Sequence, residues 1–117
     1  RRMILGVVGS RSFNDYTLLK ESLEPLSITK IVSGGARGAD SLAIDYAKEF
    51  NIPYYEYLPN FGRYGYPAAL FKRNVEIVEA SDILVAFWDG TSKGTRHTIN
   101  FTKARNKEII VITYDSI

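Results

Sequence analysis

The strongest constraint on the fold is the alternation of short apolar runs with one-sided helical stretches. Met3–Val8 and Ile83–Trp88 are continuous apolar runs of strand length, as expected for strands that are buried on both faces of a parallel sheet. Thr29–Val32, Pro53–Leu58 and Glu108–Thr113 are further runs of strand length. Strands that alternate with helices are typical of an α/β sandwich, in which helices cover both faces of the sheet.

Four stretches between these runs carry apolar residues at helical spacing. They lie in the segments 19–26, 42–50, 70–78 and 95–105. Right-handed crossovers leave few topologies, and we predict a single Rossmann-like domain over residues 1–117. It is a three-layer α/β sandwich with a five-stranded parallel sheet of order 3-2-1-4-5. This order puts the strand that begins with Pro53 at an edge, where proline is tolerated.

Composition narrows the classes of function. The 117 residues include no cysteine, which removes disulfides, thiolate catalysis and thiolate metal sites. The net charge of +2 is too small to indicate nucleic-acid binding by itself. No apolar run is long enough to cross a membrane, and Arg1-Arg2-Met3 leads directly into the first run, so we expect no signal peptide and a cytoplasmic location. His97 is the single histidine, and we expect neither a metal site nor a cofactor.

The turns that follow the strands are rich in glycine and charge, whereas the turns that precede them are plain. The four turns in question are Gly9–Ser12, Ser33–Asp40, Pro59–Tyr66 and Asp89–Thr95. In a parallel sheet they lie at one edge, where ligands bind at the point at which the strand order reverses. A Gly-rich turn that enters a helix offers backbone N–H groups to an anion. The sequence therefore predicts a shared site for an anionic ligand, most simply a nucleotide or a phosphosugar.

Four arginines belong to these turns or to nearby helical turns: Arg11, Arg37, Arg73 and Arg96. Guanidinium groups and backbone amides that converge on one place describe an anion site, and Arg37 is the strongest single candidate. The alternative for each arginine is simple surface exposure. Neither Gly-rich turn is G-x-G-x-x-G or a P-loop, so the usual dinucleotide and Walker-type sites are not indicated.

Several side chains have two interpretations that the sequence leaves open. Asp40 binds ligand hydroxyls or only balances the helix dipole. Trp88 stacks on a base or only packs, and Asn74 is a polar residue on an apolar helical stripe that needs hydrogen-bond partners if it is buried. The segment Pro59–Tyr66 is expected to be irregular, with Pro67 in the first turn of the next helix. Four aromatic residues in or near this segment either form a lid over the ligand or fill a gap at the sheet edge. They are Tyr57, Phe61, Tyr64 and Tyr66.

The motifs in this order resemble those of the SLOG superfamily, and most closely its YspA-like branch of small bacterial and phage proteins. They are Val8-Gly9-Ser10-Arg11, the stretch from Ile31 to Asp40, Lys72-Arg73-Asn74 and the stretch from Ala86 to Thr95. The resemblance implies a Rossmann-like domain that binds a nucleotide or a nucleotide-derived ligand such as ADP-ribose, as a sensor or sequestering module. It also implies a homo-oligomer.

Two relatives of that superfamily imply different functions. The LOG enzymes are phosphoribohydrolases that cleave the N-glycosidic bond of nucleoside monophosphates, and Arg73 and Gly94-Thr95 match their motifs. The position of their catalytic glutamate falls on Thr98, so that hydrolysis here requires Asp89 or Asp40 as the carboxylate. The other relative is DprA, which binds single-stranded DNA and has a motif similar to Ser33–Asp40. This chain is much shorter and its net charge is low for a DNA groove, so we do not expect nucleic acid as its partner.

We therefore predict a ligand-binding function, with N-glycosidic hydrolysis and single-stranded nucleic-acid binding as alternatives. The candidate catalytic residues are Arg73 and Asp89. The predicted ligand-binding residues are Gly9, Ser10, Arg11, Ser33, Gly34, Gly35, Ala36, Arg37, Gly38, Asp40, Arg73, Asn74, Trp88, Asp89, Gly90, Ser92, Gly94 and Thr95.

Overall fold

The computed structural model describes residues 3–115 and contains strands and helices in strict alternation, apart from two consecutive helices after β3. The elements are β1 (Ile4–Gly9), α1 (Tyr16–Leu23), β2 (Lys30–Ser33), α2 (Ala39–Glu49), β3 (Tyr54–Glu56), α3 (Phe61–Tyr64), α4 (Ala68–Ala80), β4 (Ile83–Trp88), α5 (Lys93–Ala104) and β5 (Glu108–Thr113). Among these helices, none combines the length and the apolar character that crossing a membrane requires.

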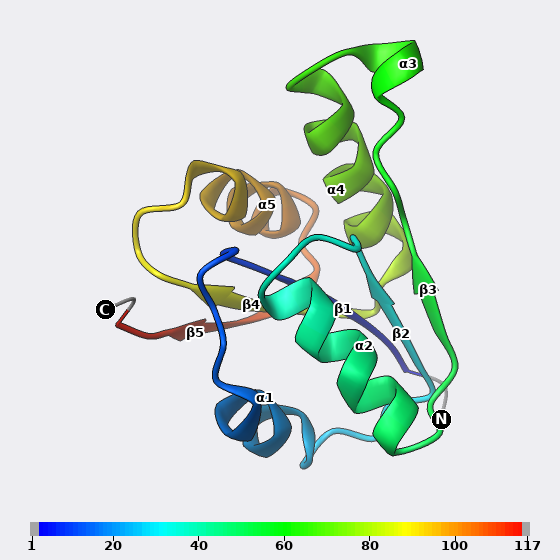
Figure 1. Cartoon of the computed structure of the whole chain (residues 1–117), viewed down its shortest axis with the longest axis vertical. Helices are drawn as coiled ribbons and strands as arrows, with labels where there is room; N and C mark the ends of the chain where they lie inside the picture. The colour runs from blue at the N-terminus through cyan, green and yellow to red at the C-terminus, as the bar shows by residue number, and fades with distance from the viewer. Residues whose placement is uncertain (1–2, 116–117) are drawn as a thin grey trace.

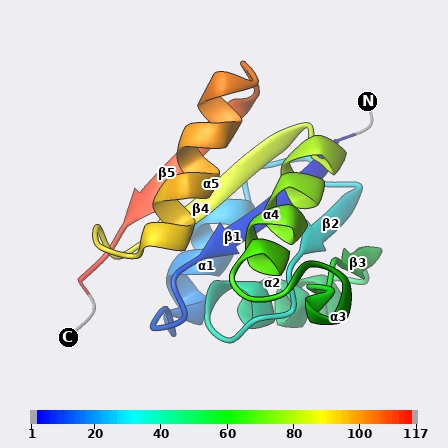
Figure 2. The ribbon, with the colours of Figure 1, turned by 90° about the horizontal axis from the view of Figure 1, so that it is seen from above.

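The strands form one parallel sheet of order β3-β2-β1-β4-β5, which confirms the predicted fold class and strand order. Strand β1 lies at the centre, with Leu5 paired to Ile31 of β2 on one side and to Ile83 of β4 on the other. Helices α1 and α2 cover one face of the sheet, and α4 and α5 cover the other (Figures 1 and 2). The result is the predicted three-layer sandwich.

The central strands feed two apolar layers because successive side chains of a strand point to opposite faces. Leu5 and Val7 of β1 are buried in the layer that includes Leu19 of α1. Val8 of the same strand is buried in the other layer, with Ile77 of α4. Burial on both faces explains why the sequence of β1 is continuously apolar instead of alternating.

The segment around β3 differs from the sequence prediction. Strand β3 is shorter than the predicted Pro53–Leu58, and its three residues are exposed. It pairs with β2 at one end of the strand order, which confirms the predicted edge position. The segment 59–66 is not wholly irregular, since it contains the short helix α3. Asn60 caps this helix by accepting a hydrogen bond from the Arg63 N–H at 3.1 Å. Two glycines and the lack of an apolar stripe hide the helix in the sequence.

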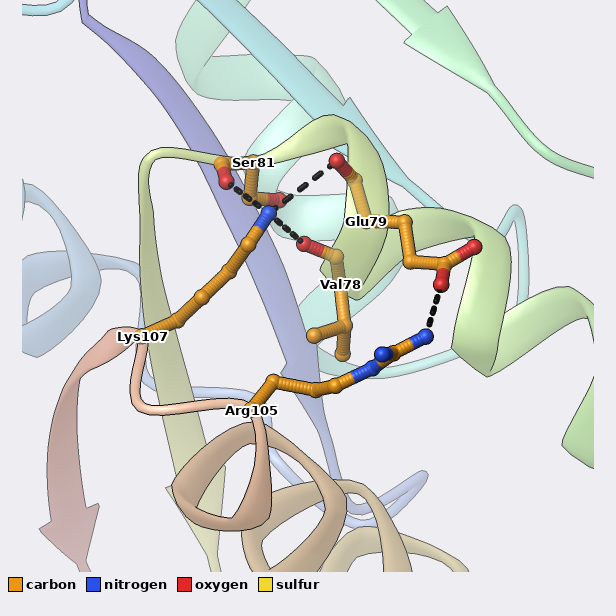
Figure 3. Close-up of polar contacts among 5 residues, drawn as sticks. All are labelled: Val78, Glu79, Ser81, Arg105 and Lys107. Carbon is orange, nitrogen blue, oxygen red and sulfur yellow. Dashed lines mark hydrogen bonds and ion pairs between the residues drawn. The ribbon is translucent and has the colours of Figure 1, made fainter.

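The C-terminal end of α4 is held by two side chains that follow α5 in the chain, those of Arg105 and Lys107. The ammonium group of Lys107 donates to three carbonyl oxygens at this helix end, those of Val78, Glu79 and Ser81, at 2.8, 3.0 and 2.7 Å (Figure 3). Arg105 forms an ion pair with the Glu79 carboxylate. The last carbonyl oxygens of a helix have no hydrogen-bond donors within the helix. Here the ammonium group of Lys107 supplies the donors.

Candidate functional site

A cleft of about 420 Å³ lies at the carboxyl edge of the sheet. Its walls come from the turn after β1, the loop between β2 and α2, and the first turns of α4 and α5. Figure 2 shows α4 and α5 on the same face of the sheet, on either side of β1. The lining residues are Val8, Gly9, Ser10, Arg11, Ala36, Asp40, Tyr66, Pro67, Leu70, Phe71, Arg73, Asn74, Ser92, Lys93, Gly94, Thr95 and Thr98. This volume is typical of a site for a small molecule.

Arg73 is a buried arginine that lines the cleft from α4, with 7% of its surface exposed. Its Nη1 donates to the carbonyl oxygen of Gly34 at 2.5 Å, and its Nε donates to Asn74 Oδ1 at 2.9 Å. Burial lowers the pKa of Arg73, while the charge of Asp40 acts to raise it. These contacts fix the guanidinium against the β2–α2 loop, and they explain why a polar Asn74 is found on an otherwise apolar helical stripe.

Asp40 is a buried carboxylate in the first turn of α2, with 6% of its surface exposed. Its Oδ2 accepts a hydrogen bond from the backbone N–H of Ala36 at 3.2 Å. Its Oδ1 is buried and has no hydrogen-bond partner within residues 3–115. Burial raises the pKa of Asp40 to about 6, against the opposing effects of the backbone N–H groups of Ala36 and Gly34 and of the Arg73 charge. Asp40 is therefore poised to change its protonation state near neutral pH.

Two glycines let the turn after β1 and the β2–α2 loop approach each other closely. Gly38 has a φ of 83°, and a Cβ added to it would lie 2.4 Å from the carbonyl oxygen of Ser10. A Cβ added to Gly9 would lie 2.6 Å from the Cβ of Ala39. Only glycine suits these positions, because any side chain would collide with the facing segment. The two glycines therefore allow two walls of the cleft to pack directly against each other.

The N-terminus of α5 supplies a positive end to the cleft. Its N-cap residue, Ser92, makes no side-chain cap hydrogen bond, and no acidic residue lies in the first turn. Gly94 and Thr95 of that turn line the cleft, where the helix dipole favours an anion. One turn further, buried Thr98 donates its hydroxyl to the Gly94 carbonyl at 3.0 Å.

The loop between β4 and α5 is organised by Asp89. Its Oδ1 accepts hydrogen bonds from the N–H groups of Thr91 and Ser92 at 2.9 and 2.8 Å, and its Oδ2 accepts from Ser92 Oγ at 2.9 Å. Although burial acts to raise it, these hydrogen bonds lower the pKa of Asp89 to about 2. The carboxylate is thus engaged within its own turn, and Asp89 does not line the cleft.

Comparison with known proteins identifies the family of this chain. Residues 3–64 match the model of the family described as “YspA, cpYpsA-related SLOG family”. The chain belongs to this SLOG family. The Gene 61 protein of Mycobacterium phage D29 is 32% identical over 120 residues, which cover 92% of this chain and 93% of that protein. No solved structure matches the chain significantly.

The SLOG-like motifs contribute to the cleft in two ways. Many of the predicted ligand residues line it: Gly9, Ser10, Arg11, Ala36, Asp40, Arg73, Asn74, Ser92, Gly94 and Thr95. The others lie outside the lining: Ser33, Gly34, Gly35, Arg37, Gly38, Trp88, Asp89 and Gly90. This second group includes residues that hold the first in place, as Gly34 holds Arg73 and Asp89 holds Ser92.

Arg37 and Trp88 illustrate the difference between a motif residue and a lining residue in this SLOG-family chain. Arg37 is exposed on the β2–α2 loop. Trp88 donates its indole N–H to the carbonyl oxygen of Ser92 at 3.1 Å, and the Arg96 guanidinium lies 5.5 Å from the centre of its ring. Neither Arg37 nor Trp88 lines the cleft, and Trp88 instead supports Ser92, which does.

Part of the lining was not predicted from the sequence. These residues are Val8, Pro67, Leu70, Phe71, Lys93 and Thr98, and Tyr66 is the one member of the aromatic set left open that reaches the cleft. The sequence predicted Pro67 in the first turn of α4, but in the structure it is the N-cap residue that precedes this turn. In the sequence, Leu70 and Phe71 belong to an apolar helical stripe of the kind that packs on a core. In the structure they line the cleft, because the first turn of α4 lies at the carboxyl edge of the sheet. That position in the topology is the signal that finds them.

Proposed function

We propose that this chain binds a phosphorylated, nucleotide-derived ligand of the ADP-ribose or nucleoside monophosphate kind, as a sensor or sequestering module. The observation that carries the proposal is the buried guanidinium of Arg73 in the same cleft as the uncapped N-terminus of α5. A buried cation and free helix amides together favour a phosphate. Membership of the SLOG family supports a nucleotide-related ligand.

The cleft offers different chemistry to different parts of such a ligand. The first turn of α5, with Lys93 and Gly94, suits the phosphate. Leu70 and Phe71 of α4 provide apolar surface for a ring. Phe71 is itself packed against the His97 ring, with a centroid separation of 4.6 Å. This arrangement gives a phosphate end and an apolar end within one small volume.

Calorimetry of the full chain with ADP-ribose and AMP tests the proposal. We expect binding, and we expect Arg73→Gln to weaken it at least about tenfold because a charge-assisted contact is lost. The matched control is Arg105→Gln, which removes the same charge far from the cleft and is expected to bind as the unchanged chain does. Comparing the affinities of Arg37→Gln and Arg73→Gln shows which arginine binds the ligand: Arg37, which the sequence motif favours, or Arg73, which lines the cleft. Absence of binding by both nucleotides at millimolar concentration contradicts the proposal.

A second candidate function is hydrolysis of an N-glycosidic bond, and one observation favours it. Asp40 is a carboxyl group that lines the cleft near Arg73, with its pKa raised to about 6, which suits general acid–base chemistry. Asp89 is held within its own turn, so Asp40 is the better carboxylate for this reaction. Release of adenine from AMP, abolished by Asp40→Asn, supports this activity, and an inert chain at high concentration rejects it.

A further inference from the structure

The buried carboxylate of Asp40 contains an oxygen that the protein itself does not satisfy. Asp40 Oδ1 is the one buried side-chain polar atom within residues 3–115 that lacks a hydrogen-bond partner, and Asp40 lines the cleft. Buried polar atoms are normally paired, and an exception needs an explanation. A buried and unpaired carboxylate oxygen, in a residue that lines the cleft, is explained if a ligand brings the donor.

The neighbouring arginine does not fill this role. Arg73 directs Nη1 to the Gly34 carbonyl and Nε to Asn74, and the ion pairs found within residues 3–115 are Lys20–Glu49 and Arg105–Glu79. Asp40 and Arg73 nevertheless meet at Gly34. A Cβ at that residue would lie 2.6 Å from Arg73 Nη1 and 2.9 Å from Asp40 Oδ2. The site thus holds a buried, unpaired acceptor beside a fixed cation.

We infer that Asp40 Oδ1 accepts a hydrogen bond from a hydroxyl group of the ligand, so that the cleft selects ligands that carry a free sugar hydroxyl together with their phosphate. This inference rests on the proposed function and adds an orientation to it. The phosphate lies at the N-terminus of α5, and the sugar hydroxyls lie toward α2, between Asp40 and Arg73. A hydroxyl suits this place because it donates to the carboxylate and also accepts from the guanidinium.

A hydroxyl bound in this way favours the ionised form of Asp40. Burial raises the pKa of Asp40 to about 6 in the free protein, and the charged groups that act on it are Arg73 of α4 and Glu56 of β3. Donation from the ligand lowers that pKa in the complex. Binding therefore releases a proton below about pH 6, and affinity falls by up to about tenfold for each pH unit of acidification in that range.

The hydroxyl requirement is tested by calorimetry with AMP and 2′,3′-dideoxy-AMP at neutral pH. We expect the dideoxy compound to bind the unchanged chain at least about tenfold more weakly, because Asp40 Oδ1 stays unpaired. We expect Asp40→Asn, in which an amide NH₂ group replaces one acceptor oxygen, to show a smaller difference between the two compounds. The matched control Asp45→Asn removes an exposed carboxylate from the same helix and is expected to keep the difference. The comparison in the unchanged chain remains decisive if Asp40→Asn does not fold.

The proton linkage is tested with ADP-ribose between about pH 5 and 8. Both of its phosphates are esterified, so neither has the second ionisation near pH 6 of a phosphate monoester. We expect the affinity of the unchanged chain to fall below pH 6 and that of Asp40→Asn to stay flat. Equal affinities for AMP and its dideoxy analogue, or an affinity that rises on acidification, overturn this inference and leave the proposed function standing. Failure of AMP and ADP-ribose to bind at all overturns both.

Discussion

At the scale of single residues, the cleft depends on a carboxyl group that is costly to keep ionised. Asp40 is buried in the first turn of α2, and one of its oxygens has no partner within the described chain. Its pKa is raised from the usual 3.8 to about 6, chiefly by burial. In the folded protein the protonated form is therefore favoured relative to the unfolded chain. Asp40 thus contributes stability that is complete below about pH 4 and is lost as the pH rises through about 6.

The first prediction concerns the pH dependence of this contribution. A shift of about two pKa units corresponds to about 3 kcal/mol, so Asp40→Asn should be more stable than the unchanged chain by up to about that amount at pH 7. At pH 4 the two proteins should be similar, because Asp40 is then largely protonated when folded. Urea unfolding at the two pH values measures the difference. A constant difference between the proteins at both pH values contradicts the prediction.

At the scale of elements, α4 links the cleft to the opposite edge of the sheet. It carries Arg73, which lines the cleft. Its C-terminal end is held by Lys107, the residue that immediately precedes β5 (Figure 3). A positive charge at a helix C-terminus also interacts favourably with the helix dipole. The lysine therefore fixes the helix without any contact with the ligand cleft.

The second prediction follows from this separation. Lys107→Met should lower the free energy of unfolding by about 2 kcal/mol, because the carbonyls of α4 lose charge-assisted hydrogen bonds. The affinity for ADP-ribose should stay unchanged in the folded variant. The control is Lys103→Met, since Lys103 is exposed on α5, and this variant should have nearly the stability of the unchanged chain. Equal urea midpoints for the two variants would count against the prediction.

At the scale of the whole molecule, the topology gathers segments that are far apart in sequence. The central position of β1 brings the turn after it between the β2–α2 loop and the start of α5. Each wall belongs to an element of the packed sandwich, so the cleft exists only in the folded chain. A ligand of this cleft must therefore stabilise the fold as a whole.

The third prediction is that ADP-ribose raises the melting temperature of the chain. At a ligand concentration of about 100 times Kd, linkage gives about 2.7 kcal/mol, which is several degrees for a domain of this size. The effect should be strongly reduced in Arg73→Gln and retained in Arg105→Gln. Differential scanning calorimetry measures it. The same melting temperature with and without saturating ligand would show that the folded chain has no site for it.

The homo-oligomeric state implied by the SLOG resemblance stays a prediction. Sedimentation equilibrium of the full chain measures it directly. A single species with the mass of one chain would contradict it.

The fold could be predicted largely from the sequence because its determinants are local or follow general rules. Continuous apolar runs such as Ile83–Trp88 mark strands that are buried on both faces, and right-handed crossovers then limit their order. The proline at the start of the third run marked the edge. The short helix α3 escaped prediction because a four-residue helix has no hydrophobic stripe, and its signal is the single cap at Asn60.

By itself the sequence determined which edge of the sheet carries the cleft, because the glycine-rich turns all follow strands. Only the tertiary structure decided which side chains face the cleft. Arg37 belongs to the most suggestive motif yet is exposed, whereas Arg73 from a later helix is buried and lines the cleft. The physical reason is that a loop side chain takes its direction from contacts between distant segments. Here these contacts are the approach of Gly38 to Ser10 and the hydrogen bond from Arg73 to Gly34.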